Sequence, residues 1–473
     1  MSLVFDVRVE RPRLTVHEGL RLSVQIENQS VGAVELPSTF DESGALAIDV
    51  TLDEGRRRRM SGLTSQAMLT TGRVDPRPML DTLAAGGRWT DTLDLASFHY
   101  PLPAGRHLVE AKFDFEPGDI HLRSGPHPIE VSDAPVSRVV ALRDRAILDG
   151  IVLILEARGA QGYEYYLRQH NFGRPLAAWY SERILEGVQV ESVFCASAAF
   201  DDAETFDPFW DRWVLWRHRR TLSARLHRWG GALGEIRRAP FPEGRELVAS
   251  AGQSLDGEVR VFFASPGGRL ECYRLGARSL EPVFERQFPD LSPSRSLVRC
   301  DGDAFHVILA GQRIRYGRLT HQGEVVDQRA FAVTRTPLHT IDFEPRSGVL
   351  KAACWDAPHG TTLQLLAMNV DSGEEHRLDI DHVPLRGGIR EVALDVNPGG
   401  RLRALVSTPR GGLYYLGENV APALIASGSG PFHPVVAAGQ RTYLGCSRPG
   451  LGYRFLELGR KGGPRALDYE LLA

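Results

Sequence analysis

The chain has 473 residues, of which 42% are hydrophobic and 24% are charged, and its formal net charge at neutral pH is −3. This is the composition of an ordinary folded protein and excludes an intrinsically disordered chain. The slightly acidic balance argues against a general nucleic-acid binder, whose basic surface would dominate its domain. A chain of this length predicts two or three domains, unless it is built from repeats.

The sequence contains no targeting or membrane signal that we can identify. The N-terminus lacks an apolar core segment, and no run of 18 uncharged apolar residues occurs, so we expect neither a secretory signal nor membrane insertion. An odd number of isolated thiols without C-x-x-C spacing is typical of a reducing compartment, and we therefore expect a cytoplasmic protein without disulfides. The five cysteines are Cys195, Cys272, Cys300, Cys354 and Cys446.

Residues 1–134 consist of short segments in which apolar and polar residues alternate. This period of two predicts about seven strands and an antiparallel β-sandwich. The predicted strands are 3–9, 21–28, 33–37, 46–52, 87–95, 105–115 and 126–132. The phrase YPLPAGRHLVEAKF, which begins at Tyr100, resembles the penultimate strand of many bacterial immunoglobulin-like domains. That resemblance implies an Ig-like β-sandwich and carries no activity with it.

We interpret two features between these strands as connecting segments without a binding role. Arg56 to Arg59 follow an acidic Asp-Glu-Gly turn, so we expect a solvated hairpin turn in preference to an anion or nucleic-acid contact. The stretch 60–80 has no strand pattern and is predicted to be a long loop.

From residue 135 onward a phrase of four short strands repeats seven times. Four-stranded units of about 40–50 residues without helices are typical of propeller blades. The units are 135–186, 187–243, 244–291, 292–335, 336–386, 387–428 and 429–473. Pro-Gly turns recur between second and third strands, as at Thr408 to Gly412. This part resembles the seven-bladed β-propeller superfamily, so the predicted fold class is all-β: an N-terminal Ig-like β-sandwich (1–134) followed by a seven-bladed β-propeller (135–473).

The marks of particular propeller families are missing. A Trp-Asp pair should close the third strand of each WD40 repeat, but the single pair, Trp355-Asp356, ends a predicted second strand. Neither a kelch double glycine nor a regular tryptophan pattern recurs.

The sequence carries no specific enzyme signature. Phosphate-binding, zinc-protease, nucleophile-elbow and calcium-loop motifs do not occur, so we predict no catalytic residue, no cofactor and no metal ligand. One histidine, His433, lies near a first strand and could pair with an acid from another blade in the channel. Asp301 with Asp303, and Asp395 with Asn397, could share a hard cation but more often cap turns.

The predicted second blade contains the most aromatic and basic stretch, FDPFWDRWVLWRHRR at 206–220. Alternation places Trp213 and Trp216 on opposite faces of one strand, where we expect both to pack between blades. The arginines could simply cover these aromatic side chains with their apolar stems. Alternatively, since Trp and Arg are enriched at the energetic centres of interfaces, the stretch could form a protein-binding surface. The predicted partner-binding residues are Phe209, Trp210, Arg217, Arg219, Arg220, Arg225 and Arg228.

These features favour a non-enzymatic cytoplasmic scaffold that binds a protein partner of unknown identity. The layout loosely resembles propeller proteins of bacterial multi-protein systems. An alternative is a hydrolase or lyase with its site in the propeller channel, because a propeller can assemble a site from one residue per blade. A weaker alternative is binding of single-stranded nucleic acid by the aromatic and basic face of blade two.

Overall fold

The computed structural model describes residues 2–466 of the chain with gaps. The gaps are 39–44, 62–79, 95–101, 144–149, 161, 172–178, 198–211, 228–233, 254–257, 266, 289–295, 301–303, 311–312, 334–337, 345–346, 357–361, 381–387, 397–400, 419, 428–431, 439–441, 449 and 459–463. The described residues are almost entirely β-strand, with one short 3-10 helix, Glu116–Gly118 (η2). The predicted all-β class is therefore confirmed.

The N-terminal strands form three sheets among the described residues. One has the order β1-β3-β8, one has the order β2-β11-β9-β5-β6 with β10 paired to β9, and β4 pairs with β7. The strands are β1 Leu3–Val9, β2 Arg13–Thr15, β3 Arg21–Asn28, β4 Val34–Pro37, β5 Leu46–Thr51, β6 Arg57–Ser61, β7 Leu80–Leu83, β8 Arg88–Asp94, β9 Gly105–Phe115, β10 Ile120–Arg123 and β11 His127–Ser132.

The period of two explains how the two larger N-terminal sheets pack. Every second residue of β3, including Val24 and Ile26, is fully buried, and the same holds for Val109 and Phe113 on β9. These residues share one hydrophobic cluster, and Phe5 of β1 lies 6.4 Å from Phe113 between ring centroids. The apolar faces of the two sheets therefore form a single core.

The arginine run at Arg56 differs from the prediction. Only Arg56 belongs to the turn, because β6 begins at Arg57 and pairs with β5. Arg57 donates to Asp49 at 2.8 Å, and Arg56 pairs with Glu54. The cationic side chains thus lie along an edge strand, where charge opposes pairing with a further strand. The predicted loop at 60–80 lies mostly outside the described residues.

The described part of the chain from Val136 onward forms seven antiparallel sheets, each made of four consecutive strands. Sheets one to three contain β12 Val136–Arg143, β13 Gly150–Gly159, β14 Gly162–Asn171, β15 Trp179–Glu186; β16 Ser192–Ser197, β17 Arg212–His218, β18 Thr221–His227, β19 Ile236–Pro240; β20 Glu246–Gln253, β21 Val259–Ser265, β22 Arg269–Leu275 and β23 Leu280–Gln287. Sheets four to seven contain β24 Ser296–Cys300, β25 Phe305–Ala310, β26 Arg313–Leu319, β27 Val325–Val333; β28 Leu338–Glu344, β29 Val349–Trp355, β30 Leu363–Asn369, β31 Glu375–Ile380; β32 Glu391–Val396, β33 Leu402–Ser407, β34 Gly412–Gly417, β35 Val420–Ser427; β36 Val435–Ala438, β37 Thr442–Arg448, β38 Gly452–Leu458 and β39 Pro464–Ala466.

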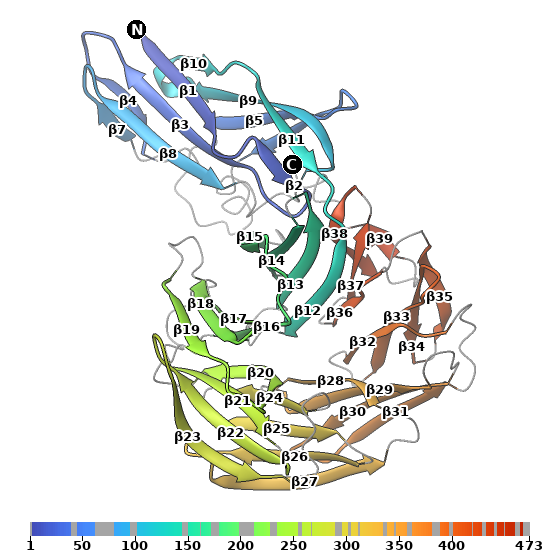
Figure 1. Ribbon diagram of the computed structural model, residues 1–473. Coiled ribbons are helices and arrows are strands. Elements are labelled where there is room, and N and C mark those ends of the chain that lie inside the picture. The colour runs from blue at the N-terminus through green and yellow to red at the C-terminus, as the bar shows by residue number, and fades with distance from the viewer. Residues whose placement is uncertain are drawn as a thin grey trace.

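Hydrophobic clusters join each of these sheets to the next. A single four-stranded sheet cannot hide both of its apolar faces, so each face needs a neighbour. Separate clusters join sheets one and two, and so on around to sheets six and seven. A further cluster joins the seventh sheet back to the first through Phe455 and Leu153. The sheets therefore surround a common centre, as Figure 1 shows.

Arginines on outer strands connect three successive pairs of sheets. Arg237 of β19 donates to the carbonyl of Leu275, the last residue of β22, at 3.0 Å. Arg286 of β23 reaches the carbonyl of Gly323, and Arg329 of β27 donates to the carbonyl of Asp371 at 2.9 Å. We call these three contacts the arginine staples, because each extends from a fourth strand to the end of the third strand of the following sheet or to the turn after it.

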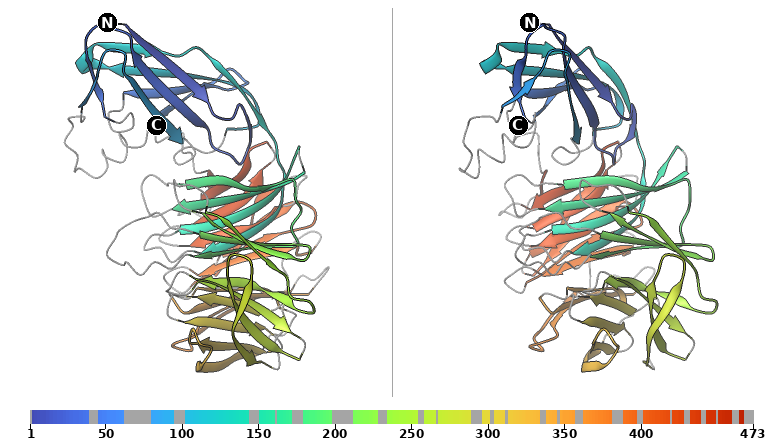
Figure 2. Two further views of the ribbon diagram at one scale, coloured as in Figure 1. Left: turned by 60° about the vertical axis from the view of Figure 1, so that its left-hand side comes forward. Right: turned by 90° about the vertical axis from the view of Figure 1, so that its left-hand side faces the viewer.

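The N-terminal sheets lie beside the first and last of the seven sheets. Figure 2 shows them at one end of the molecule, with the four-stranded sheets below. Only residues 133–135 separate β11 from β12, so the connection between the two parts is short.

Candidate functional site

The second sheet holds the stretch that the sequence singled out. Trp213 and Leu215 of β17 pack against the third sheet, whereas Val214 and Trp216 pack against the first sheet. Trp213 is 5% exposed and Trp216 is 7% exposed. The predicted alternation is confirmed, and both tryptophans are part of the inter-sheet core.

Three of the predicted arginines gather at the tip of the hairpin between β17 and β18. His218 pairs with Thr221 in register, so Arg219 and Arg220 form a two-residue turn. Arg219 is exposed and has a φ of 53°, in the left-handed region. Such turns favour Gly, Asn or Asp, and a branched-Cβ or long side chain there costs about 1 kcal/mol. An arginine at this position therefore stabilises the fold less than glycine would.

The contacts that these arginines make differ in strength. Arg217 lies over the ring of Phe241 at 3.9 Å from its centroid and forms an ion pair with Glu191 at 2.9 Å. Arg220 pairs with Glu243 at 3.4 Å, but both side chains are more than four-fifths exposed. Exposed pairs of this kind contribute roughly 0–1 kcal/mol. The guanidinium groups of Arg219 and Arg220 therefore remain accessible to a binding partner.

Of the remaining predicted residues, Arg225 lies within the described part of the chain. It pairs in register with Val214 and donates to the carbonyl of Gly234 at 3.0 Å. Phe209, Trp210 and Arg228 lie outside the described residues.

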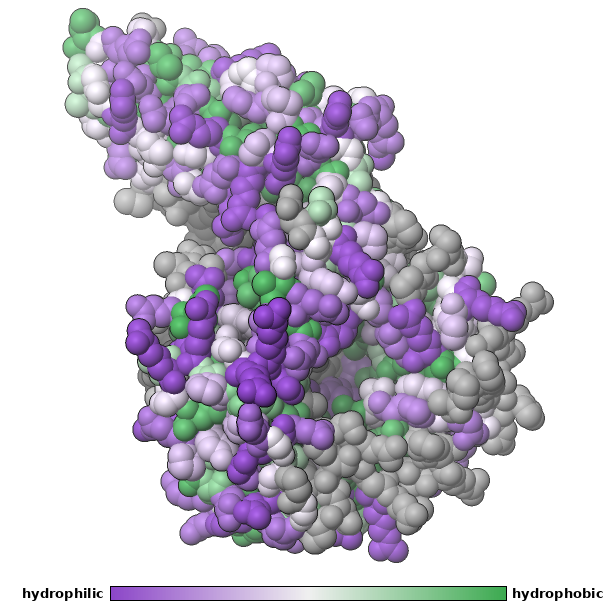
Figure 3. All heavy atoms as spheres, viewed as in Figure 1, coloured by the Kyte–Doolittle hydropathy of each residue, from purple (hydrophilic) through white to green (hydrophobic). Residues whose placement is uncertain are grey.

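The arginines around the turn between β17 and β18 form one surface. We define the arginine tip as Arg217, Arg219 and Arg220, together with exposed Arg238 on the neighbouring strand β19. Arg238 pairs in register with Ser223, two residues along β18 from the turn. The sequence alone does not indicate Arg238 as part of this surface, because its distance from the tip depends on strand register. Figure 3 shows hydrophilic side chains gathered over this side of the molecule.

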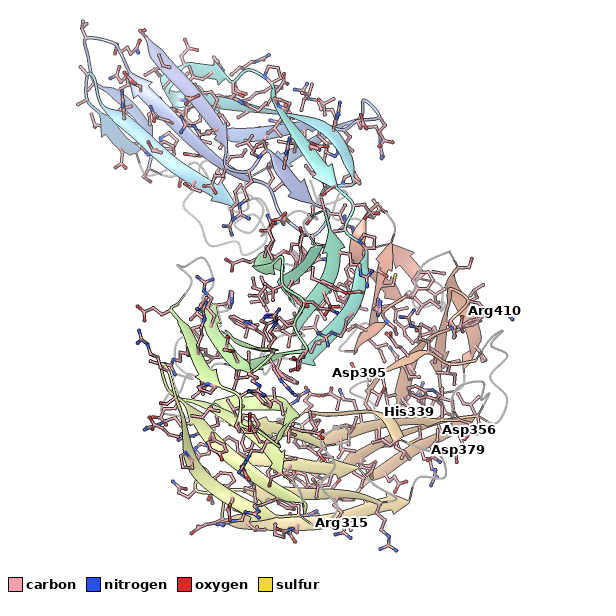
Figure 4. All side chains as sticks on the ribbon, in the orientation of Figure 1. Arg315, His339, Asp356, Asp379, Asp395 and Arg410 are labelled. Carbon is pink, nitrogen blue, oxygen red and sulfur yellow. The ribbon has the colours of Figure 1, made fainter. Side chains whose placement is uncertain are left out.

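Charged side chains on the first and second strands of the fourth, fifth and sixth sheets contact one another. Arg299 of β24 donates to Asp342 of β28 at 3.1 Å. Lys351, which is 3% exposed, lies 3.5 Å from Asp342 and 3.3 Å from Asp395 of β32. Figure 4 shows Asp395 on the side of its sheet that faces the centre. We call these four residues the channel-wall network.

Electrostatics favour the ionised form of Asp342 in the channel-wall network. Partial removal from water would by itself raise the pKa of Asp342, but the charges of Lys351 and Arg299 outweigh this effect and lower it. Two cations face two carboxylates, so the network is neutral as a set.

The histidine that the sequence indicated does pair with an acid from another sheet. His433 precedes β36 and is 3% exposed, and its Nδ1 lies 3.1 Å from a carboxylate oxygen of Glu391 on β32. Because a carboxylate only accepts hydrogen bonds, Nδ1 is the donor in this contact. Within the described part of the chain, Nε2 has no hydrogen-bond partner. The hydroxyl of Tyr453 donates to the carbonyl of His433 at 2.9 Å and holds the backbone.

No group of three or more His, Cys, Asp or Glu side chains that could hold a metal occurs among the described residues. Asp301, Asp303 and Asn397 lie outside them, whereas Asp395 contacts Lys351. Where the structure describes cysteine side chains, four thiols are free: those of Cys272, Cys300, Cys354 and Cys446. In the described part of the chain, no helix is long and apolar enough to cross a membrane.

These observations define a class: an all-β protein with a β-propeller-type fold, built from successive four-stranded antiparallel sheets. No protein-family model matches the sequence. No curated protein matches it either.

Several solved structures are similar over part of the chain. One is Sqt1 of Saccharomyces cerevisiae, at 10% identity and a TM-score of 0.36, covering 66% of this chain and 81% of that one. Another is BBS1N in complex with ARL6DN, at 10% identity and a TM-score of 0.36, covering 70% and 95%. A third is a protein of unknown function from Bacteroides caccae, at 14% identity and a TM-score of 0.32, covering 60% and 93%. We draw no functional argument from these similarities.

Proposed function

We propose that this chain is a non-enzymatic cytoplasmic scaffold, in which a seven-bladed β-propeller and an N-terminal Ig-like sandwich present surfaces to protein partners. The proposal places the boundary between the two parts at residues 134 and 135. The seven four-stranded sheets and the clusters between them support the blade count. A rigid ring with short connecting turns suits recognition. Membership of a bacterial multi-protein assembly is part of the same proposal.

The observation that carries this proposal is the arginine tip. Arg219 has a left-handed backbone that disfavours its side chain, and the side chain is exposed. Backbone strain of this kind clusters at functional sites, where an external contact offsets the cost. Two adjacent exposed guanidinium groups suit carboxylates, so the partner surface should be acidic.

The neutrality of the channel-wall network supports a non-enzymatic role. Its cations and carboxylates contact one another. A substrate would have to compete with these internal ion pairs, which argues against a ready-made anion or cation site at this position.

The test is capture of partners by the full chain from native lysate, followed by binding measurements with the purified partner. Arg219→Glu reverses a charge at the tip and should weaken binding by about thirtyfold, which corresponds to about 2 kcal/mol. Arg410→Glu is the matched control, because Arg410 is an exposed arginine in the equivalent turn of the sixth sheet, between β33 and β34, and these strands lie across the ring from β17 and β18 in Figure 1. Equal binding by wild type and Arg219→Glu would refute the assignment of the tip.

A second candidate function rests on the Glu391–His433 pair. A carboxylate that orients a histidine is the arrangement used by general bases, and it would suit a hydrolase or lyase in the channel. Turnover of chromogenic esters or glycosides by the full chain, lost in His433→Gln and kept in His121→Gln, would support it. Absence of turnover in wild type would remove it.

Single-stranded nucleic acid is the third option for the aromatic and basic face. The test is a gel-shift assay with single-stranded DNA or RNA at low salt. A shift caused by wild type and lost in Arg219→Glu would favour nucleic acid over a protein partner.

A further inference from the structure

In the described part of the chain, no connecting segment crosses the seam between the first and last of the seven sheets. Each described sheet is built from one contiguous stretch, so no strand is shared between β12–β15 and β36–β39. Neighbouring sheets elsewhere are linked by the chain itself, whereas the seam depends on noncovalent contacts. One is direct: Arg168 of β14 donates to the carbonyl of Tyr453 on β38 at 2.8 Å.

A turn of the N-terminal part, residues 15–18, sits at this seam. The hydroxyls of Thr15 and Tyr166 lie 2.8 Å apart. The Nε2 of His17 donates to the carbonyl of Ala134 at 2.7 Å, and the hydroxyl of Ser181 donates to the carbonyl of His17. His17 is fully buried. The turn is therefore bound to the first sheet by side-chain and backbone groups together.

A buried carboxylate adds a charged contact to the same sheet. Glu18 is 7% exposed in its side chain and lies 3.0 Å from a guanidinium nitrogen of Arg183 on β15. Its other oxygen accepts the backbone N–H of Thr15 at 3.0 Å. Burial, together with the negative charge of Glu18 and the hydrogen bond to Glu164, raises the pKa of Tyr166, which keeps that hydroxyl protonated.

The last sheet contacts the N-terminal part as well. A Cβ added to Gly452, at the start of β38, would lie 2.7 Å from the carbonyl oxygen of Val16. The backbone N–H of Ala104 donates to the carbonyl of Gly450 at 2.8 Å, and the N–H of Gly450 donates to Asp133 at 3.1 Å. The N-terminal part thus contacts both sides of the seam at once.

We propose that residues 15–18 act as a clasp, which holds the seam between the first and last sheets closed, so that withdrawal of the clasp opens the ring there and nowhere else. The inference is independent of the arginine tip and of any partner that it binds. It assigns to the N-terminal part a role in the architecture of the ring, beside its role as a surface.

Hydrogen–deuterium exchange of the full chain tests the clasp. Gly452→Ala places a methyl group against Val16 and His17, and should raise exchange at least about tenfold in β12–β14 and β37–β38 without changing β28–β31 across the ring. Gly244→Ala, in the connection between the second and third sheets, is its matched control. Gly452 and Gly244 have φ values of 70° and 68°, so alanine is equally strained at both, but nothing lies within 4 Å of the added Cβ at Gly244.

A second pair of variants guards against misfolding of the glycine variants. Glu18→Gln removes the charge that Arg183 contacts, and should raise exchange at the seam selectively. Glu271→Gln also removes a buried carboxylate, one that contacts Arg245 at 2.7 Å in the third sheet, and should leave the seam unchanged. Three outcomes would overturn the clasp: exchange that rises evenly over all sheets, exchange that rises at the seam as much in Gly244→Ala as in Gly452→Ala, or exchange that does not rise at the seam at all.

Discussion

Acid should weaken the clasp through His17. Burial, together with the charge of Arg168 and, less strongly, that of Arg454, lowers the pKa of His17 to about 3, although its hydrogen bond to Ala134 partly opposes the shift. The histidine is therefore neutral in the folded protein, whereas in the unfolded chain it gains a proton below its ordinary pKa of 6.5.

Proton binding to His17 makes the free energy of unfolding depend on pH. The unfolded state binds more protons below pH 6.5, so the contribution of His17 to stability is complete above 6.5 and declines as the pH falls from 6.5 toward 3. Between about pH 8 and about pH 5 this loss is about 2 kcal/mol, since each pH unit below 6.5 costs about 1.4 kcal/mol.

Equilibrium unfolding in urea, followed by tryptophan fluorescence at both pH values, measures this loss. His17→Gln keeps an N–H donor for the Ala134 carbonyl and removes the ionisable ring, so its free energy of unfolding should fall by about 2 kcal/mol less than that of wild type over the same interval. Comparing the two proteins cancels the other titrating groups. His121→Gln, at an exposed histidine, should behave as wild type. Equal losses in wild type and His17→Gln would refute the reasoning.

Three further outcomes follow from the packing. Lys351→Met leaves the buried carboxylate of Asp395 without its cation and should lower the free energy of unfolding by about 3–5 kcal/mol. Gly323→Ala forces a Cβ against the ring of Phe284 at a left-handed φ, and should cost more than about 2 kcal/mol by the same measurement. Burial raises the pKa of the Cys354 thiol to about 12, so iodoacetamide at about pH 8 should alkylate it only after unfolding, as mass spectrometry would show.

Matched variants separate these effects from general destabilisation. Arg269→Gln breaks an exposed ion pair with Glu285 and should cost less than about 1 kcal/mol. Gly244→Ala has a similar left-handed φ but no neighbour within 4 Å, so only the backbone strain of about 1 kcal/mol should remain. Alkylation of native Cys354 at the rate of an exposed thiol would contradict its burial.

Much of the strand structure could be predicted, because a period of two reports which residues face a core. All seven N-terminal segments expected from alternation are strands, and the two faces of β17 are buried as alternation requires. Short strands such as β2 and β10 were missed, since three or four residues are too few to show a period. The pairing of His433 with an acid of another sheet was also predictable in kind, though Glu391 was not identifiable.

Contacts between distant segments account for what could not be predicted. The clasp joins residue 15 to residue 166, and no local pattern indicates that a Thr-Val-His-Glu turn will meet a tyrosine so far along the chain. The arginine staples are hidden for a related reason. Only three of the 56 basic residues are lysines, so arginine is frequent throughout the chain. The sequence therefore does not distinguish an arginine that binds a carbonyl from any other arginine.

The position of the seam also has a consequence for biosynthesis. The clasp and the first sheet are synthesised before the last sheet, and Gly450 follows its hydrogen-bond partner Asp133 by 317 residues. At about 5–20 residues per second, that interval is about 15–60 s. Throughout it, the apolar flank of the first sheet that Phe455 later covers has no permanent neighbour. During this interval, the uncovered apolar flank of the first sheet exposes the nascent chain to aggregation, until the last sheet packs against it.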